Sequence, residues 1–163
     1  MLSSLKPLLY VQISPTRVVI KNLKTGAVLT EPPELAISDT TPKKVLGVGS
    51  RAQAALASTP QAQLVKPFAH PRSLVSDFSS AELLLKALVK QMIGKSMLAI
   101  SPRIVIHPLG SPDGGFTQVE RRAFRELGLG AGGSEVEVWT GRELTNIEVT
   151  TQATPPDAGE WGG

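Results

Sequence analysis

The stretch between residues 101 and 133 constrains the fold of this chain more than any other part of the sequence. An apolar run at residues 103–106 predicts a strand, and a Gly-rich connection then leads into a charged helix. Thr117 and Glu120 mark the start of this helix because they have the spacing of a capping box, in which each side chain accepts a hydrogen bond from a free backbone N–H. The stretch therefore predicts a strand–loop–helix unit of an α/β protein.

The helix after Thr117 should be amphipathic. Val119, Ala123 and Leu127 recur at the spacing i, i+4, i+8 and predict one apolar face, with charged side chains around the rest. Closely spaced glycines predict the end of the helix: Gly128, Gly130, Gly132 and Gly133.

A mixed five-stranded sheet should form the centre of the fold. The first three strands are separated by short turns and predict an antiparallel meander. A longer helix at residues 80–93 follows, and Ser79 and Glu82 have the spacing of a second capping box. The five expected strands are residues 8–13, 17–22, 27–30, 103–106 and 136–139.

A small α+β insertion interrupts this pattern. Short apolar runs at residues 35–38 and 45–48 predict strands, and an Ala-rich helix is expected at residues 50–57. We therefore expect a core subdomain, an inserted subdomain and a disordered tail rich in Gly and Pro. Their respective ranges are residues 1–30 with 76–150, residues 31–75, and residues 151–163.

In their order along the chain, these stretches resemble the rod-shape-determining MreB family of bacterial actin-like proteins. The most specific block is residues 117–125, which opens Thr-Gln-Val-Glu-Arg-Arg-Ala and is followed by Gly-Ala-Gly. Residues 28–37, 48–56 and 64–78 follow the same family, the last with Ser-Asp-Phe at its end. The resemblance covers roughly residues 8–140 and implies the first lobe of an actin-like, ribonuclease H-like fold. The second lobe of the family is not recognisable in these 163 residues.

The resemblance also places a nucleotide site, whose residues have changed in this chain. Gln12 stands where the family has an aspartate that organises the metal, Ser14 where it has a glycine, and Pro15 where it has a threonine. Glutamine carries no charge, serine adds a side chain where backbone must approach phosphate, and proline removes an N–H donor. The hydroxyls of Ser14 and Thr16 can still donate hydrogen bonds, which leaves a weak phosphate contact open. We expect no ATP and no other cofactor.

Catalytic residues are not expected either. The family's Glu-Glu-Pro segment, which helps to place the attacking water, falls at residues 140–142, and Glu143 is out of register with it. Residues 144–149 favour a strand where the family has a helix. The sequence thus predicts a protein that is not an enzyme.

Other chemistry lacks its residues. His70 and His107 are the only histidines and there is no cysteine, so we expect no metal site. Residues 110–115 precede a helix, as a phosphate loop would, but they lack the Gly-Lys-Ser/Thr ending and favour a plain turn. The net charge is +3 with scattered cations and few aromatic residues, which argues against nucleic-acid binding.

A hydrophobic connection after the long helix is the candidate contact surface. Met97, Leu98 and Ile100 fall in a predicted loop, where the family carries residues that dip into the inner leaflet of the membrane. The alternative is that these side chains cap the local core. No apolar run reaches the roughly 18 residues that span a bilayer. The N-terminal segment lacks the features of a signal peptide, so the expected location is the cytoplasm, with peripheral contact at the inner membrane.

The resulting functional hypothesis is a non-catalytic, MreB-related protein associated with bacterial cell-shape determination. Its expected partners are full-length MreB filaments or other cell-elongation proteins. The alternative is an ATP-dependent cytoskeletal filament protein with residual nucleotide binding. Self-association is also open, because apolar surface beside Val11, Ile13 and Val138 should be exposed without a second lobe.

Overall fold

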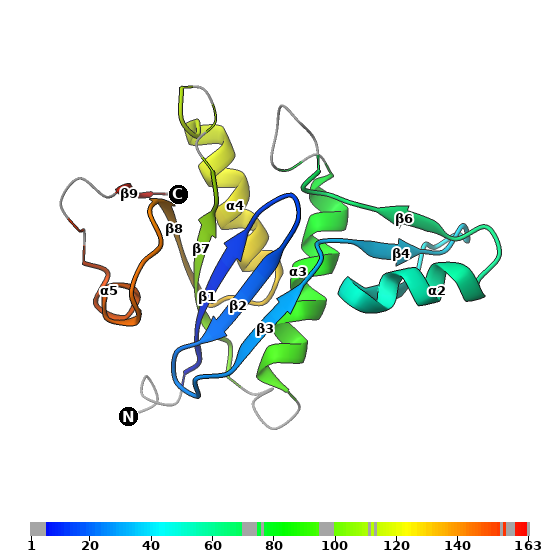
Figure 1. Ribbon diagram of the computed structural model, residues 1–163, viewed down its shortest axis with the longest axis horizontal. Helices are drawn as coiled ribbons and strands as arrows, with labels where there is room; N and C mark the ends of the chain where they lie inside the picture. The colour runs from blue at the N-terminus through cyan, green and yellow to red at the C-terminus, as the bar shows by residue number, and fades with distance from the viewer. Residues whose placement is uncertain are drawn as a thin grey trace.

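The computed structural model describes residues 6–69, 75, 77–94, 100–110, 112, 114–153, 155 and 159–162. Its centre is a six-stranded mixed sheet in the order β3-β2-β1-β7-β8-β9 (Figure 1). β1 pairs antiparallel with β2 and parallel with β7, β7 pairs parallel with β8, and β8 pairs antiparallel with β9. The strands are β1 (Leu8–Ile13), β2 (Val18–Asn22), β3 (Val28–Glu31), β7 (Arg103–Pro108), β8 (Glu135–Gly141) and β9 (Gly159–Gly162).

β1 lies in the middle of the sheet and is buried on both faces. Because successive side chains of a strand point to opposite faces, Leu9, Val11 and Ile13 pack in one hydrophobic cluster, and Leu8 and Tyr10 pack in another. A nearly continuous apolar run is the expected sequence of such a strand.

Helices α3 (Phe78–Ile93) and α4 (Gln118–Gly130) contact each other and cover the first of these faces. Leu84, Leu85 and Leu88 of α3 are buried there. The expected capping box at Ser79 is wrong. Asp77 is the N-cap residue, and its carboxylate accepts a hydrogen bond from the Ser80 N–H at 3.0 Å. An aspartate two residues upstream of the predicted cap satisfies the same free N–H groups.

In α4 the Thr117–Glu120 capping box is present. Its buried face, however, is Phe124, Leu127 and Gly128, whereas Val119 is 79% exposed. Gly128 therefore does not end the helix. It lies inside the helix and packs against the sheet. The contact is so close that a side chain at this position would overlap Val136 and Ile106.

A second, three-stranded sheet in the order β5-β4-β6 carries helix α2 and projects from the α3 side of the molecule (Figure 1). β6 was not predicted. Leu35, Ile37 and Phe68 of this region belong to the same buried cluster as Leu9 and Leu84. The elements are β4 (Leu35–Ile37), β5 (Val45–Val48), the 3-10 helix η1 (Gly49–Arg51), α2 (Ala52–Ser58) and β6 (Gln63–Val65).

Three expectations for the C-terminal part and the apolar surface are wrong. The sheet has a sixth strand, β9, inside the segment expected to be a disordered tail. Residues expected to continue as a strand form the short helix α5 (Asn146–Thr151), which a Thr145–Glu148 capping box begins. Val11, Ile13 and Val138 are at most 2% exposed, because they face α3 and α4.

Candidate functional site

The carboxyl ends of the parallel strands β1, β7 and β8 meet at one edge of the large sheet. Gln12 of β1 lies opposite His107 of β7, and β8 ends at Gly141. In open α/β sheets this edge is where ligands bind. A functional site is therefore expected at this edge, which is also where the family resemblance puts the nucleotide.

A chain of buried hydrogen bonds occupies this edge. Tyr10 Oη lies 2.6 Å from His107 Nδ1, and His107 Nε2 lies 2.8 Å from the carbonyl oxygen of Gly141. A carbonyl oxygen can only accept, so Nε2 carries the proton and Nδ1 of the neutral ring accepts from the Tyr10 hydroxyl. Tyr10 Oη in turn accepts from the backbone N–H of Leu144 at 3.1 Å. The three hydrogen bonds therefore run in one consistent direction, and each of these polar atoms has a partner.

Burial keeps the side chains of Tyr10 and His107 uncharged. Tyr10 and His107 are fully buried, and their rings stack with centroids 5.8 Å apart. Burial raises the pKa of Tyr10 to about 12. Burial also lowers the pKa of His107 below its usual 6.5, against a smaller opposing effect of the hydrogen bond to Gly141. The pair joins β1 to β7 through a hydrogen bond between two uncharged side chains.

Glu143 lies beside this chain but is paired with a lysine. Its carboxylate accepts a hydrogen bond from Lys21 Nζ of β2 at 2.9 Å. Lys21 lowers the pKa of Glu143, and a hydrogen bond from the Gln12 side chain lowers it further. A carboxylate held ionised by a lysine is a weak base, because its proton affinity is reduced. In this structure Glu143 is therefore an ionised carboxylate paired with Lys21.

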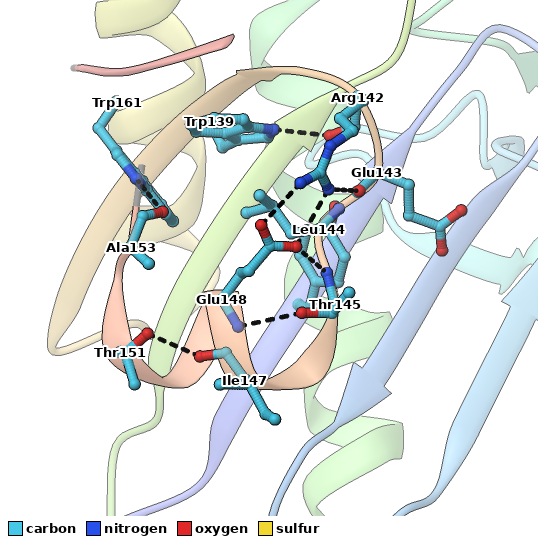
Figure 2. Close-up of polar contacts among 11 residues, drawn as sticks. Trp139, Arg142, Glu143, Leu144, Thr145, Ile147, Glu148, Thr151, Ala153 and Trp161 are labelled. Carbon is cyan, nitrogen blue, oxygen red and sulfur yellow. Dashed lines mark hydrogen bonds and ion pairs between the residues drawn. The ribbon is translucent and has the colours of Figure 1, made fainter. Parts of the chain in front are cut away.

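The segment after β8 folds back over the second face of the sheet (Figure 2). Trp139 donates its indole N–H to the carbonyl oxygen of Arg142 at 2.8 Å. Arg142 makes a two-pronged ion pair with Glu148, at 3.0 and 2.8 Å. Leu144 and Val149 are buried with Trp139 and Tyr10. The face beneath the strand ends is thus filled by the chain's own side chains.

The structure brings Ser14 and Thr16 together in the turn between β1 and β2. Ser14 Oγ accepts hydrogen bonds from the backbone N–H groups of Arg17 at 3.0 Å and Thr16 at 3.3 Å. It lies 3.1 Å from the Arg17 carbonyl oxygen, to which it can donate. The Ser14 hydroxyl is therefore used within the turn. Thr16 is exposed, and its Oγ1 lies 3.4 Å from Ser14 Oγ.

The hydrophobic contact surface is only partly described. Met97 and Leu98 lie outside the described residues. Ile100 is partly buried and lines a small cavity of ≈ 170 Å³ with Val89 and Ile93 of α3. For Ile100 this arrangement favours the alternative of capping the local core.

Sequence reasoning missed Tyr10, Lys21 and the role of His107. A usable signal was present, because period-2 alternation puts Tyr10 and Gln12 on one face of β1. The parallel register then brings His107 next to Gln12. No group of three or more His, Asp or Glu side chains that could hold a metal ion occurs among the residues with described positions.

The topology and the crowded strand edge define a class: a lobe of the actin-like type, with one sheet, two helices on one face and a small second sheet. The MreB/Mbl protein family model matches residues 9–152, so the chain belongs to the MreB/Mbl family.

Individual relatives agree with this assignment. The cell shape-determining protein MreB of Escherichia coli K12 is 37% identical over 116 residues, which is 68% of this chain and 31% of the relative. The protein of the same name from Haemophilus influenzae is 31% identical over 132 residues, which is 78% of this chain and 36% of the relative. The chain spans about a third of the length of these relatives.

Solved structures support the fold. MreB5 of Spiroplasma citri bound to ADP matches with a TM-score of 0.62 at 18% identity, over 83% of this chain and 38% of that one. The same protein bound to AMPPNP matches with a TM-score of 0.62 at 19% identity, over 82% and 38%. The actin-like fold class expected from the sequence is thus confirmed.

Proposed function

We propose that this chain is a non-catalytic member of the MreB/Mbl family that acts in bacterial cell-shape determination by binding MreB filaments or other cell-elongation proteins. The process is that named for its relatives, the cell shape-determining MreB proteins. The observation that carries the non-catalytic part is the strand edge, where the chain's own hydrogen bonds use the groups that would meet a nucleotide.

Three features of that edge weaken nucleotide binding. Gln12 brings no negative charge for a metal ion, and Pro15 offers no N–H to phosphate. Ser14 is committed to its own turn. Glu143, the nearby carboxylate, is held by Lys21.

The partner surface we propose is the outer side of α3 and α4. Phe78 and Val119 are 40% and 79% exposed, and they line a shared groove of ≈ 240 Å³ with Phe116. Exposed apolar side chains gathered at one groove are typical of a protein contact. Full-length MreB is the proposed occupant.

The proposed location is the cytoplasm, with peripheral contact at the inner membrane through Met97 and Leu98. Of the helices that the structure describes, none has both the length and the apolar composition needed to cross a bilayer. Membrane contact through Met97 and Leu98 is tested by sedimentation of the chain with liposomes of bacterial lipids, beside a Met97→Ser/Leu98→Ser variant.

A second candidate function is nucleotide-dependent filament formation with residual ATP binding. It draws on the nucleotide-bound state of the solved relatives and on the exposed hydroxyl of Thr16. The first function predicts that a titration with labelled ATP and Mg²⁺ gives no saturable signal. Saturable binding that a Thr16→Ala variant loses would favour the second.

The proposed partner is tested by a pull-down of the 163-residue chain with purified full-length MreB, with and without ATP. We expect binding that Val119→Asp weakens and that Ile147→Asp leaves unchanged. Ile147 is a matched control, because it is 75% exposed on a different helix, α5. Absence of binding under both conditions, or equal loss in both variants, would contradict the proposed contact.

A further inference from the structure

A charged groove of ≈ 580 Å³ lies between α4 and the edge strand β9, which pairs with the last residues of β8. One wall is formed by arginines on α4, and the other by the strand. The residues that line the groove include Arg121, Arg122, Arg125, Glu160, Trp161 and Gly162.

The groove carries more positive than negative charge. Arg121 pairs with Glu160 and has its Nε buried without a hydrogen-bond partner among the described residues. In the same described part of the chain, Arg122 and Arg125 form no ion pair. Like charges one helical turn apart repel each other, so an anion seated between them would relieve that repulsion.

β9 supplies a second, independent feature. It is the outermost strand of the sheet and pairs with β8 on one side only. Within the described residues its other edge has no strand beside it. Such an edge presents N–H and C=O groups that can pair with an extended segment from another chain.

The two features have matching geometry. A side chain added at Gly162 would lie 3.3 Å from Arg121 Nη1, so Gly162 faces the arginines of α4. The neighbouring Trp161 packs on Trp139 of β8, with ring centroids 5.0 Å apart. Side chains of an added strand would alternate in the same way, every second one toward the arginines and the others beside the tryptophans.

We propose that this groove binds an extended acidic segment of a partner protein, which adds to the free edge of β9 and places carboxylates, two residues apart, against Arg122 and Arg125. Apolar residues between the carboxylates pack beside Trp161. Val119 lines both this groove and the α3–α4 groove, so the two surfaces adjoin each other, but the proposal does not depend on the proposed function.

The test is fluorescence anisotropy of the 163-residue chain with a labelled peptide in which glutamate and valine alternate. Its lysine–valine counterpart is the sequence control. We expect saturable binding of the acidic peptide, weakened by salt, and none of the basic one. An acidic peptide with alternate backbone amides N-methylated should bind at least about tenfold more weakly, because it cannot complete the strand ladder.

The binding site is located with matched variants. Arg122→Glu/Arg125→Glu should lower affinity by about tenfold or more, whereas Lys43→Glu/Lys44→Glu, with the same change of net charge just before β5, should not. Arg122→Gln/Arg125→Gln gives the same comparison if the first variant does not fold. Equal loss in the groove and control variants would overturn the proposal. Undiminished binding of the N-methylated peptide would also overturn it. Displacement of the acidic peptide by inorganic phosphate would overturn it as well, because it would indicate a small-anion site.

Discussion

His107 is uncharged in the folded chain, because its ring is fully buried between a donor and an acceptor. Adding a proton would place an N–H on Nδ1, where the Tyr10 hydroxyl now donates. Tyr10 would have to turn its hydroxyl proton away from the ring to accept this N–H. Burial, which disfavours the charged ring, is the main cause of the lowered pKa of His107.

This pKa predicts a pH dependence of stability. As the pH falls below 6.5, the unfolded chain takes up a proton on this histidine before the folded chain does, so the free energy of unfolding falls. The stability linked to neutral His107 is therefore fully present above pH 6.5 and is lost toward the lowered folded-state pKa.

The measurement is urea unfolding, followed by circular dichroism above and below this pH. Glutamine keeps a donor and an acceptor but does not titrate, so His107→Gln should lose part of the acid-dependent destabilisation. At neutral pH it should cost about 1–3 kcal/mol through imperfect hydrogen bonds. An unchanged pH dependence in the variant would show that other groups cause it.

At the scale of elements, α4 sits so close to the sheet that a glycine is required at one position. A Cβ at Gly128 would lie 2.6 Å from Val136 Cγ1 and 2.9 Å from Ile106 Cδ1. Gly128→Ala should therefore destabilise by about 1–3 kcal/mol by overpacking, although alanine is the better helix former by about 1 kcal/mol.

Gly130→Ala in the same helix is the matched control. The three heavy atoms nearest to the new methyl group would be Oε2, Cδ and Cγ of Glu82, a flexible side chain that can rotate away. Its stability should stay within about 0.5 kcal/mol of the parent chain. Thermal unfolding of both variants decides the question, and equal effects would show that the close helix–sheet contact is not what limits position 128.

β9 should contribute to stability although it is short. Trp161 is half-buried on Trp139, and its indole N–H lies 3.2 Å from the Ala153 carbonyl oxygen (Figure 2). Trp161→Ala should cost about 1–3 kcal/mol and expose Trp139, seen as a red shift of its fluorescence. Glu160 is the matched position on the same strand, and Glu160→Ala should preserve the Trp139 spectrum. A Trp161→Ala chain as stable as the parent would mean that β9 does not hold the edge.

The central elements could be predicted from the sequence, whereas the C-terminal ones could not. β1 and β7 are continuous apolar runs, and α4 has both its capping box and its family block, so local and global signals agree there. Ile147 and Val149 alternate with polar residues as a strand would, and this pattern hid the Thr145 cap of α5. β9 is stabilised by Trp161 and by pairing with β8, contacts that a local reading of Gly-rich residues does not contain.

The candidate site shows the same division. Gln12, Ser14 and Pro15 could be placed by resemblance to the family, because they follow a clearly marked strand. The Tyr10–His107–Gly141 chain joins residues that are far apart in the sequence, so only the parallel pairing of β1, β7 and β8 brings them together.

At the scale of the whole molecule, the two sheets share one core. Phe68 follows β6 of the small sheet, is fully buried, and belongs to the cluster that contains Leu84 of α3 and Phe124 of α4. The small sheet therefore has no separate hydrophobic core among the described residues. A unit that buries its apolar surface only against its neighbour should unfold together with it.

Phe68→Ala tests this cooperativity. It should destabilise the chain by about 3–5 kcal/mol, because a large buried side chain is lost. Both tryptophans lie in β8 and β9 of the large sheet, so their fluorescence reports that sheet, whereas circular dichroism reports the whole chain. The two transitions should coincide and shift together in the variant. Val45→Ala, at a site 40% exposed on β5, should shift neither by more than about 0.5 kcal/mol. A circular dichroism transition that precedes the fluorescence transition would show instead that the small sheet unfolds by itself.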